Sequence, residues 1–426
     1  MIELGVLADD ITGGMMIASL LEGEGVRCPL FLTHDAVAQA PPGIEALVLA
    51  RKIRLAPADV ARDEARRAAN VFQRLGVRRI YSKYSALFDS RRDGNIGPIA
   101  EVLLDELGAP ATVFCAAYLE RDVTVYQGRL FLGSTPLAES FKRYDPVTPA
   151  WSSNLVEVLQ AQTERKVGLI TRRTLRDEVA LRARLDGARG PFHIVDAVDE
   201  DDLARVARLA IDLPLVTGGD SLAPAMARAW RRVAPLPGRR LLPPSPGSTA
   251  VLAGSCAPQT LAQIEAFSAR WPVRRVDLAV EGAQPDLARQ LIEWSRKPLA
   301  QGPVCIATSA SPDAVAGAQA RFGVAGATAR ADGLMGEIAS GLFDIGVRKF
   351  VIAGGETSGA VLGALGVAHL EVSSYDELYG GYCHQPGETP LSFVVKAGSI
   401  GDGDFLHLAL TRLEEADRSG IETEAS

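Results

Sequence analysis

Cysteine and histidine are both scarce in this chain. Among its 426 residues there are five of each. The cysteines lie far apart and none belongs to a Cys-x-x-Cys pair, so the sequence indicates neither a disulfide framework nor a structural zinc site. The histidines show no ligand spacing, which argues against a transition-metal site built from protein side chains alone. We therefore expect reduced and mostly buried thiols.

The chain also has no excess of basic residues and no long apolar run. Its 52 Asp and Glu residues outnumber its 45 Lys and Arg residues, which gives a formal net charge of −7. Without surplus positive charge to neutralise phosphates, we expect neither nucleic acid nor an anionic membrane as a partner. No run of about 18 apolar residues occurs, and no basic segment precedes the strand-like start at Met1-Ile2-Glu3-Leu4. The composition predicts a cytoplasmic protein.

A glycine-rich segment near the C-terminal end matches neither the P-loop nor the Gly-x-Gly-x-x-Gly pattern. Residues 349–353 predict a buried strand and residues 360–365 a helix, so Gly354 to Gly359 form a strand-to-helix turn. Such a turn presents unpaired backbone N–H groups, and its glycines let an anion approach them. The segment predicts a nucleotide or phosphate site of a less common class. The alternative is a tight turn in which Thr357 or Ser358 caps the helix.

Strand-like runs alternate with helix-like stretches along most of the chain. This rhythm predicts an α/β fold with mostly parallel sheets covered by helices. It stops in a segment rich in proline and glycine, which we take as a linker over residues 235–248. We expect one domain over residues 1–234 and a second over residues 249–413. The polar residues 414–426 are expected to fray.

Charged residues follow several of the predicted strands in the N-terminal half. Asp9 and Asp10 lie directly after the first strand, where open α/β sheets bind ligands. Their carboxylates are candidates for a general base, a metal contact or hydroxyl recognition, although Asp10 or Thr12 could merely cap the next helix. An aspartate-nucleophile phosphatase is disfavoured, because adjacent acids on extended backbone point to opposite sides. Arg54 and Lys83 also follow strands and could bind a carboxylate or phosphate.

Two further glycine-containing turns follow strands in the C-terminal half. Gly254 and Ser255 begin one of them, and Gly398 lies in the other. Each by itself could be only a tight turn. Together with the segment at Gly354 they strengthen the prediction of a nucleotide site, because neighbouring strand ends can form one crevice.

In combination, these motifs resemble the four-carbon acid sugar kinases over nearly the whole chain, and within them the 3-oxo-tetronate kinase branch. The resemblance is carried, in chain order, by Asp9-Asp10-x-Thr12-Gly13, Gly94-Asn95-Ile96-Gly97, Tyr126-Gln127-Gly128, Val216-Thr217-Gly218-Gly219, Gly254-Ser255-Cys256 and Gly354-Gly355-Glu356-Thr357-Ser358-Gly359.

The resemblance implies an ATP-dependent kinase that uses Mg²⁺ and phosphorylates a small acid sugar such as 3-oxo-tetronate, threonate or erythronate. It implies an N-terminal domain for the acid sugar, a C-terminal domain for ATP and an active site in the cleft between them. The implied nucleotide contacts are Ser255, Gly354, Gly355, Glu356, Thr357, Ser358, Gly359 and Gly398. The implied substrate contacts are Arg54, Lys83, Asp89, Asn95, Gly218 and Gly219. Asp9 or Asp10 would accept the substrate proton or position Mg²⁺, and no metal ligand is otherwise assigned.

Departures from the branch pattern fall mostly in the acid-sugar half. Ala86-Leu87 replace Ser-Thr, Asp122-Val123 replace Gly-Arg, Asp145 replaces His and Ser152 replaces an Asp. A neutral polar group of the substrate that finds no partner in the pocket costs about 1–3 kcal/mol. The substrate is therefore open, and the alternative is a nucleotide-binding regulatory or degenerate member without kinase activity. The sequence also leaves the oligomeric state open, a homodimer included.

Overall fold

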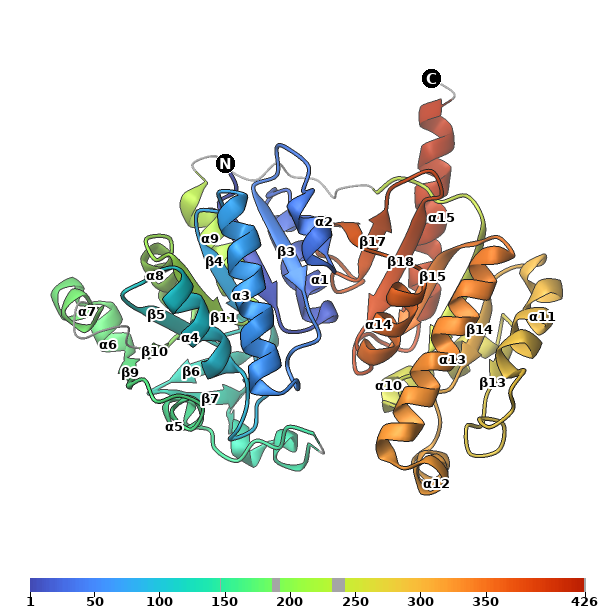
Figure 1. The fold of residues 1–426 in the computed structure, drawn as a ribbon, viewed down its shortest axis with the longest axis horizontal. Helices are drawn as coiled ribbons and strands as arrows, with labels where there is room; N and C mark the ends of the chain where they lie inside the picture. Colours follow the sequence, from blue (N-terminus) through green and yellow to red (C-terminus); the bar gives the residue numbers. More distant parts are fainter. Residues whose placement is uncertain (146, 186–191, 232–241, 425–426) are drawn as a thin grey trace. The chain divides into compact units, whose positions relative to one another are not determined.

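The computed structural model describes residues 1–145, 147–185, 192–231 and 242–424, and the chain divides into two compact units, Met1–Gly238 and Arg239–Ser426 (Figure 1). Each unit contains a mostly parallel run of strands with helices packed on it. This confirms the predicted α/β fold. Much of the predicted linker, residues 235–241, lies outside the described residues.

The strands of the large sheet in the N-terminal unit are parallel and follow the order β2-β3-β1-β4-β11-β5-β10-β9. Their bounds are β1 Leu4–Ala8, β2 Leu30–Phe31, β3 Ala46–Ala50, β4 Ile80–Lys83, β5 Thr112–Cys115, β9 Val167–Ile170, β10 Phe192–Val195 and β11 Leu215–Gly218. The helices are α1 Ile11–Gly23, α2 His34–Ala38, α3 Ala58–Arg74, α4 Ile96–Glu106, α5 Leu155–Gln160, α6 Arg172–Leu175, α7 Glu178–Leu185, α8 Glu200–Ala210 and α9 Leu222–Trp230.

Two central strands, β1 and β3, are apolar along their whole length because helices cover the sheet. Every residue of β1 and β3 is buried. In α3, residues such as Ala61, Ala65 and Phe72 form a buried face, while the rest of the helix is polar. Figure 1 shows α3 and α4 side by side, covering this sheet. Binary patterning alone therefore accounts for the layers of this unit.

A small antiparallel sheet of β6 Val123–Tyr126, β7 Arg129–Leu132 and β8 Thr135–Pro136 is added to the N-terminal unit. Short 3₁₀ helices flank it at Leu119–Arg121, Leu137–Glu139 and Phe141–Tyr144. Gln127 and Gly128 join β6 to β7 with φ of 50° and 69°. Two successive positive φ values are typical of a tight hairpin turn, which explains this motif by backbone geometry.

The C-terminal unit has the strand order β13-β14-β12-β15-β18-β17-β16, and only β17 is antiparallel to its neighbours. The strands are β12 Ser248–Ala253, β13 Val273–Arg275, β14 Val304–Ala307, β15 Val347–Ala353, β16 His369–Val372, β17 Tyr382–Gln385 and β18 Leu391–Lys396. The helices are α10 Pro258–Ser268, α11 Leu287–Leu299, α12 Pro312–Phe322, α13 Val324–Asp344, α14 Gly355–Ala364 and α15 Phe405–Glu424.

Where the sequence predicts a frayed segment over residues 414–426, α15 continues to Glu424, and fraying of its end stays a prediction. Ala416 is buried against the core of this unit. Asp417 pairs with Lys349 and accepts a hydrogen bond from the backbone N–H of Ser245 at 3.2 Å. The apolar contact of Ala416 and the ion pair of Asp417 thus fix this part of α15 to the unit, although the segment is polar in sequence.

The thiols are free, and four of the five are buried, as expected, while Cys256 is exposed. Within the described parts of the chain, no helix is both long and apolar enough to cross a membrane.

Candidate functional site

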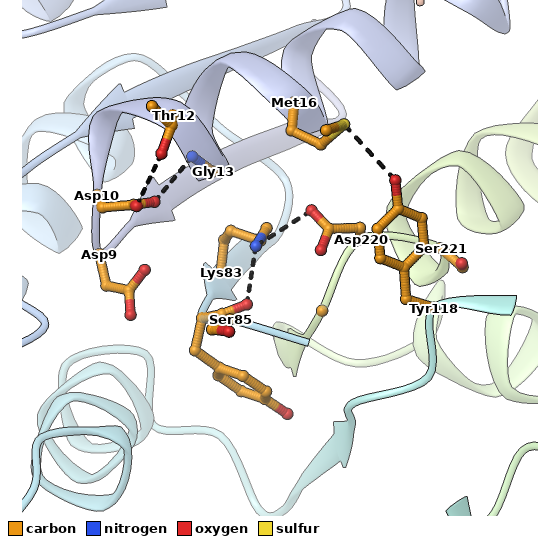
Figure 2. Close-up of polar contacts among 12 residues, drawn as sticks. Asp9, Asp10, Thr12, Gly13, Met16, Lys83, Ser85, Tyr118, Asp220 and Ser221 are labelled. Carbon is orange, nitrogen blue, oxygen red and sulfur yellow. Dashed lines mark hydrogen bonds and ion pairs between the residues drawn. The ribbon is translucent and has the colours of Figure 1, made fainter. Parts of the chain in front are cut away.

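In the N-terminal unit, charged side chains gather beyond the carboxyl ends of β3, β1, β4 and β11, which are neighbours in the sheet. We call Asp9, Asp10, Arg54, Lys83 and Asp220 the charged cluster. Parallel strands present their carboxyl ends at one edge, so residues distant in sequence meet there. Figure 2 shows Asp9, Asp10, Lys83 and Asp220 within one close-up, with Lys83 pointing toward Asp220.

Arg54 holds Asp9 through two hydrogen bonds. Its Nε donates to Oδ2 of Asp9 at 2.9 Å and its Nη2 donates to Oδ1 at 2.7 Å. Burial raises the pKa of Asp9, and the Arg54 guanidinium opposes that shift without cancelling it. Only 7% of the Asp9 side chain is exposed. Because Asp9 is buried and bonded to Arg54, we expect it to orient Arg54 rather than to contact a ligand.

Asp10 has two roles in the structure. It caps α1, because its carboxylate accepts hydrogen bonds from Gly13 N at 2.8 Å and from Thr12 Oγ1 at 2.9 Å. It also lies 3.1 Å from Nη2 of Arg54, and 28% of its side chain is exposed. Burial raises the pKa of Asp10, but Arg54, Lys83 and the capping hydrogen bonds outweigh burial, so the pKa is lowered overall. The capping interpretation is confirmed, and a charged, accessible carboxylate remains.

Lys83 is buried and paired with Asp220. Its Nζ lies 3.2 Å from Oδ1 of Asp220 and donates to the carbonyl of Tyr84 at 2.8 Å. Burial raises the pKa of Asp220, and Lys83 counters it in part. Sequence reasoning misses Asp220, although it lies two residues after β11, close to a strand end like Asp9 after β1. The pairing itself depends on strand order and leaves no mark in the local sequence.

Gly218 and Gly219, predicted to contact substrate, are buried against Tyr81. The Tyr81 hydroxyl donates to the carbonyl of Gly219 at 2.8 Å, and a Cβ at Gly218 would lie 2.2 Å from that hydroxyl oxygen. These glycines make room for a buried phenol. The structure gives them a packing role, and direct contact with substrate stays a prediction.

Asn95 supports the loop that carries Arg54. Its Nδ2 donates to the backbone carbonyls of Ile53 at 2.8 Å and Ala56 at 2.6 Å. A buried amide that bridges two carbonyls restricts the path of the loop between them. Asn95 thus fixes the backbone on both sides of Arg54. Its predicted contact with substrate stays a prediction.

Asp89 is neutralised by a lysine that sequence reasoning misses. Oδ1 of Asp89 lies 2.7 Å from Nζ of Lys142, and Oδ2 accepts from the hydroxyl of Ser85 at 2.6 Å. Lys142 also lies 2.7 Å from Asp145, the residue that replaces the branch's usual His. Burial opposes ionisation of Asp145, but hydrogen bonds from Lys142 and from backbone N–H groups lower its pKa to about 2. The departure at Asp145 therefore completes an ion-pair network.

Other departures from the branch pattern have structural roles. Ala86 is buried and packs close to Gly219. Asp122 adopts a left-handed conformation, with φ of 55°, where the chain enters β6. Ser152 donates to Glu157 at 2.8 Å on an exposed part of the chain. None of these three side chains belongs to the charged cluster.

The C-terminal unit contains a cavity of about 310 Å³ beyond the carboxyl ends of its parallel strands. We call it the nucleotide cavity because most of the predicted nucleotide contacts line it. These are Ser255, Gly354, Gly355, Glu356, Thr357 and Gly398. The three glycine-containing turns after β12, β15 and β18 therefore meet at one site, as the sequence predicts.

Close packing between the turns requires their glycines. A Cβ at Gly398 would lie 2.0 Å from Oγ of Ser255, and one at Gly254 would lie 2.1 Å from Oγ1 of Thr357. Gly354 has a φ of 128°, which side chains rarely tolerate, and it precedes the first turn of α14. The result is a helix N-terminus with unobstructed backbone donors, a geometry suited to phosphate.

Two predicted nucleotide contacts do not line the cavity. Ser358 is buried and its hydroxyl donates back to the carbonyl of Gly354 at 2.6 Å, while Gly359 lies further along α14. A hydroxyl near the start of a helix can bond the carbonyl four residues back, which turns it away from solvent. The capping alternative is also wrong, because Gly354 occupies the N-cap and no side chain caps α14.

Lys396, at the end of β18, is a further residue that sequence reasoning misses. Its buried Nζ donates to Oγ1 of Thr260 at 3.0 Å and to the carbonyl of Gly398 at 3.1 Å. Burial lowers its pKa to about 8. Lys396 thus fixes the Gly398 turn against α10 and contributes positive charge next to the nucleotide cavity.

Family models match both units of the chain. One described as a sugar-binding N-terminal domain covers residues 4–226, and one described as a nucleotide-binding C-terminal domain covers residues 250–406. A protein of Burkholderia multivorans named 3-oxo-tetronate kinase is 38% identical over 97% of this chain and 98% of its own length. The chain belongs to the four-carbon acid sugar kinase family. The recognition made from motifs is thereby confirmed.

Other members of the family agree over similar lengths. A 3-oxo-tetronate kinase of Salmonella typhimurium is 32% identical and covers 95% of this chain and 98% of its own. A crystal structure from Salmonella typhimurium LT2 matches with a TM-score of 0.83 and 30% identity, covering 97% of this chain and 99% of that one. A Haemophilus influenzae protein matches with a TM-score of 0.77 and 30% identity, covering 96% and 100%.

Proposed function

We propose that this protein is an ATP-dependent kinase that phosphorylates a hydroxyl of a four-carbon acid sugar. The observation that supports this most is that one chain contains both a cavity lined by backbone donors and the charged cluster of three carboxylates and two cations. The relatives' names favour 3-oxo-tetronate as the first substrate to test, followed by threonate and erythronate. Phosphoryl transfer requires positioning and charge stabilisation more than covalent help, and these two sites offer both.

The phosphate chain of ATP fits the glycine turns. The N-terminus of α14 presents unpaired N–H groups, and Gly355 has open space where a Cβ would otherwise stand. Ser255 and Thr357 add hydroxyls from the neighbouring turns. Phosphate oxygens can therefore bond to backbone donors without displacing a side chain.

Magnesium would be held mainly by the phosphates. In the part of the chain that the structure describes, no group of three or more His, Cys, Asp or Glu side chains is arranged to hold a metal. Mg²⁺ in kinases commonly takes one or two carboxylates, with water and phosphate oxygens as its other ligands. Asp277, Asp332 and Glu356 line the nucleotide cavity and are the carboxylates from which such a ligand would come. The site residues are therefore compatible with Mg²⁺ delivered as Mg-ATP.

Within the charged cluster, we assign proton acceptance to Asp10 and carboxylate binding to Arg54. Asp10 is four times as exposed as Asp9, at 28% against 7% of the side chain. Arg54 is likewise accessible at 24%, whereas Lys83 is 2% exposed. Lys83 and Asp220 would act by holding the charge distribution around Asp10. An acid sugar needs one cation and several oxygen acceptors, which this arrangement supplies.

The test is a panel of four- to six-carbon sugar acids with Mg-ATP, monitored by ADP release. We expect turnover with 3-oxo-tetronate or a close analogue, and a fall in kcat of about 10²–10⁴-fold in Asp10→Asn. Asp63→Asn is the matched control, because Asp63 is an exposed carboxylate on α3. ADP release from no acid, in protein that binds ATP, would refute the kinase.

The alternative is a nucleotide-binding regulatory member without kinase activity. The observation that favours it is that Arg54, Lys83 and Lys142 are each paired with a carboxylate of this chain. Cys256 reports ATP binding in either case, since it is exposed, lines the nucleotide cavity and is the one thiol not buried, and turnover then separates the two cases. If ATP slows alkylation of Cys256 by iodoacetamide and no acid supports turnover, the regulatory alternative holds.

A further inference from the structure

Four lysines are buried in the described part of the chain, and Lys396 differs from the other three in its partners. Those three form ion pairs with carboxylates of this chain: Lys83 with Asp220, Lys142 with Asp89 and Lys349 with Asp417. Lys396 forms no ion pair with any described residue, and the groups that accept from its Nζ carry no charge. Buried charges are normally paired, because an unpaired one is costly. Among the described residues, Lys396 is therefore a buried cation without a counter-charge.

The groups in contact with Lys396 are neutral on every side. Its Nζ donates to Oγ1 of Thr260 on α10 at 3.0 Å and to the carbonyl of Gly398 at 3.1 Å. The ring of Phe405 on α15 has its centroid 5.8 Å from Nζ, so it offers a cation–π contact. These contacts hold the ammonium in place but leave its charge uncompensated.

The titratable groups on the elements around Lys396 do not balance this charge either. Burial alone lowers the pKa of Lys396 to about 8. Tyr382 of β17 lies opposite Val394 and so shares the face of Lys396, but an ordinary phenol is uncharged up to about pH 10. His407 of α15 lies against α10, with Nε2 3.3 Å from the carbonyl of Ala266. Three acids on or beside these helices are exposed: Glu265 of α10, and Asp402 and Asp404 just before α15.

The Gly398 turn connects Lys396 to the nucleotide cavity. Gly398, whose carbonyl accepts from Lys396, lines that cavity. A Cβ on Gly398 would lie 2.0 Å from Oγ of Ser255, which lines it as well. An anion held on this turn would thus have the Lys396 ammonium on the far side of the backbone. Charges interact strongly across such a layer, because no water screens them there.

We propose that Lys396 is a positioning residue for ATP, which supplies the counter-charge to the phosphates on the Gly398 turn, so that ATP binds tightly only while Lys396 keeps its proton. The proposal rests on the proposed function, since it takes the anion in the cavity to be ATP. A neutral lysine still has N–H donors, so the hydrogen bonds to Thr260 and Gly398 can persist when the charge is lost. A pH effect on binding therefore reports the charge of Lys396 and not the fold of the turn.

The experiment measures the dissociation constant of Mg-ATP by calorimetry between about pH 7 and 9. Bound phosphates should raise the pKa of Lys396 above its value of about 8 in the free protein, so affinity is full below that pH and is lost above it. We expect the wild type to bind about five- to tenfold more weakly at about pH 9 than at about pH 7. Lys396→Arg keeps its charge and should change by less than about twofold. Lys396→Met should already bind about tenfold more weakly at about pH 7, with an equally flat profile.

Two control variants separate Lys396 from other groups. Lys297→Met removes an exposed lysine from α11 of the same unit and should keep the wild-type profile. Cys256→Ala should also keep the fall in affinity. It is needed because Cys256 lines the nucleotide cavity and ordinary thiols lose their protons in this pH range. A flat profile in Cys256→Ala would assign the effect to the thiol and overturn the proposal.

Proton uptake provides a second measurement, which does not depend on the folding of any Lys396 variant. At about pH 8.5 the phosphates of ATP are already ionised. Calorimetry in buffers of different ionisation enthalpy should therefore show that the wild type takes up about half a proton or more on binding ATP. No uptake, or a fall in affinity that persists in Lys396→Arg and Lys396→Met, would overturn the role of Lys396. If the wild type does not bind ATP at about pH 7, it is the proposed function that fails.

Discussion

The two halves of this kinase-family chain place their candidate sites beyond the carboxyl ends of parallel strands, but they build them by opposite chemical means. The N-terminal charged cluster uses side chains that neutralise one another, such as Arg54 with Asp9 and Lys83 with Asp220. The nucleotide cavity uses backbone N–H groups and residues with little or no side chain, such as Gly354, Gly398 and Ala314. The first site is therefore specified by the placement of charged side chains, and the second by small residues that leave backbone N–H groups accessible.

This difference bears on the departures from the branch pattern that the sequence suggests. Glycines such as Gly254 and Gly398 leave no room for a Cβ, so the motif that they form is recognisable in the sequence. In the acid-sugar half, Asp145 pairs with Lys142, so this departure from the branch pattern adds no unpaired charge. The acid-sugar half can therefore diverge in sequence while its charges remain compensated.

The largest effect should come from Arg54→Met, which breaks the ion pair at the centre of the charged cluster. Asp9 would stay buried without its guanidinium, and removing one partner of a buried pair costs about 3–5 kcal/mol. Urea unfolding measures the loss, and ATP binding to the other unit should be unchanged. Arg62→Met is the control, because Arg62 is 41% exposed and lies 3.4 Å from Glu101. Equal destabilisation by both variants would contradict a charge-built site.

Gly354→Ala should have a smaller effect on stability and a selective one on binding. The φ of 128° and a Cβ only 3.1 Å from Oγ1 of Thr357 should cost about 2–3 kcal/mol. We expect ATP affinity to fall at least about tenfold. Gly363→Ala is the control on the same helix, since a Cβ there meets no atom within 4 Å and should change stability by less than about 1 kcal/mol. Unchanged ATP affinity in Gly354→Ala would argue against a backbone-built site.

The smallest effect should be a loss of stability on acidification, and it should occur in both units. Burial lowers the pKa of His193 on β10 and of His384 on β17 from 6.5 to about 4. Between these values the unfolded chain binds a proton that the folded chain excludes, so stability falls as pH falls. We expect a loss of about 1–2 kcal/mol for each histidine between about pH 7 and 5. Hydrogen exchange in β10 and β17, corrected for intrinsic rates, measures each unit separately.

His384→Asn provides the control for this last comparison. Asn can keep a hydrogen bond to Ser392, which lies 3.2 Å from Nδ1 of His384, without binding a proton. The pH-dependent loss of protection should then vanish in β17 and persist in β10. If it persists in both strands, a group other than His384 is responsible.

Local sequence patterns are enough to predict the layers of both units and the three glycine turns. Strands buried on both faces have long apolar runs, as residues 350–353 show, and glycines that permit close approach leave a visible motif. The patterns do not show that the Ser358 hydroxyl bonds back to Gly354, because its direction is set by the helix that forms there. They also do not show the contacts that Ala416 and Asp417 make in α15, because the partner of Asp417, Lys349, is distant in the sequence.

By itself, the sequence determined the α/β rhythm, the family and the turns that can approach phosphate, because these depend on residues close together along the chain. The glycine segment from Gly354 to Gly359 is the clearest example. Only the tertiary structure decided that Lys83 pairs with Asp220, that Lys142 neutralises Asp89 and that Lys396 fixes the Gly398 turn. Strand order and helix packing bring these groups together, and neither is encoded in the spacing of residues along one segment.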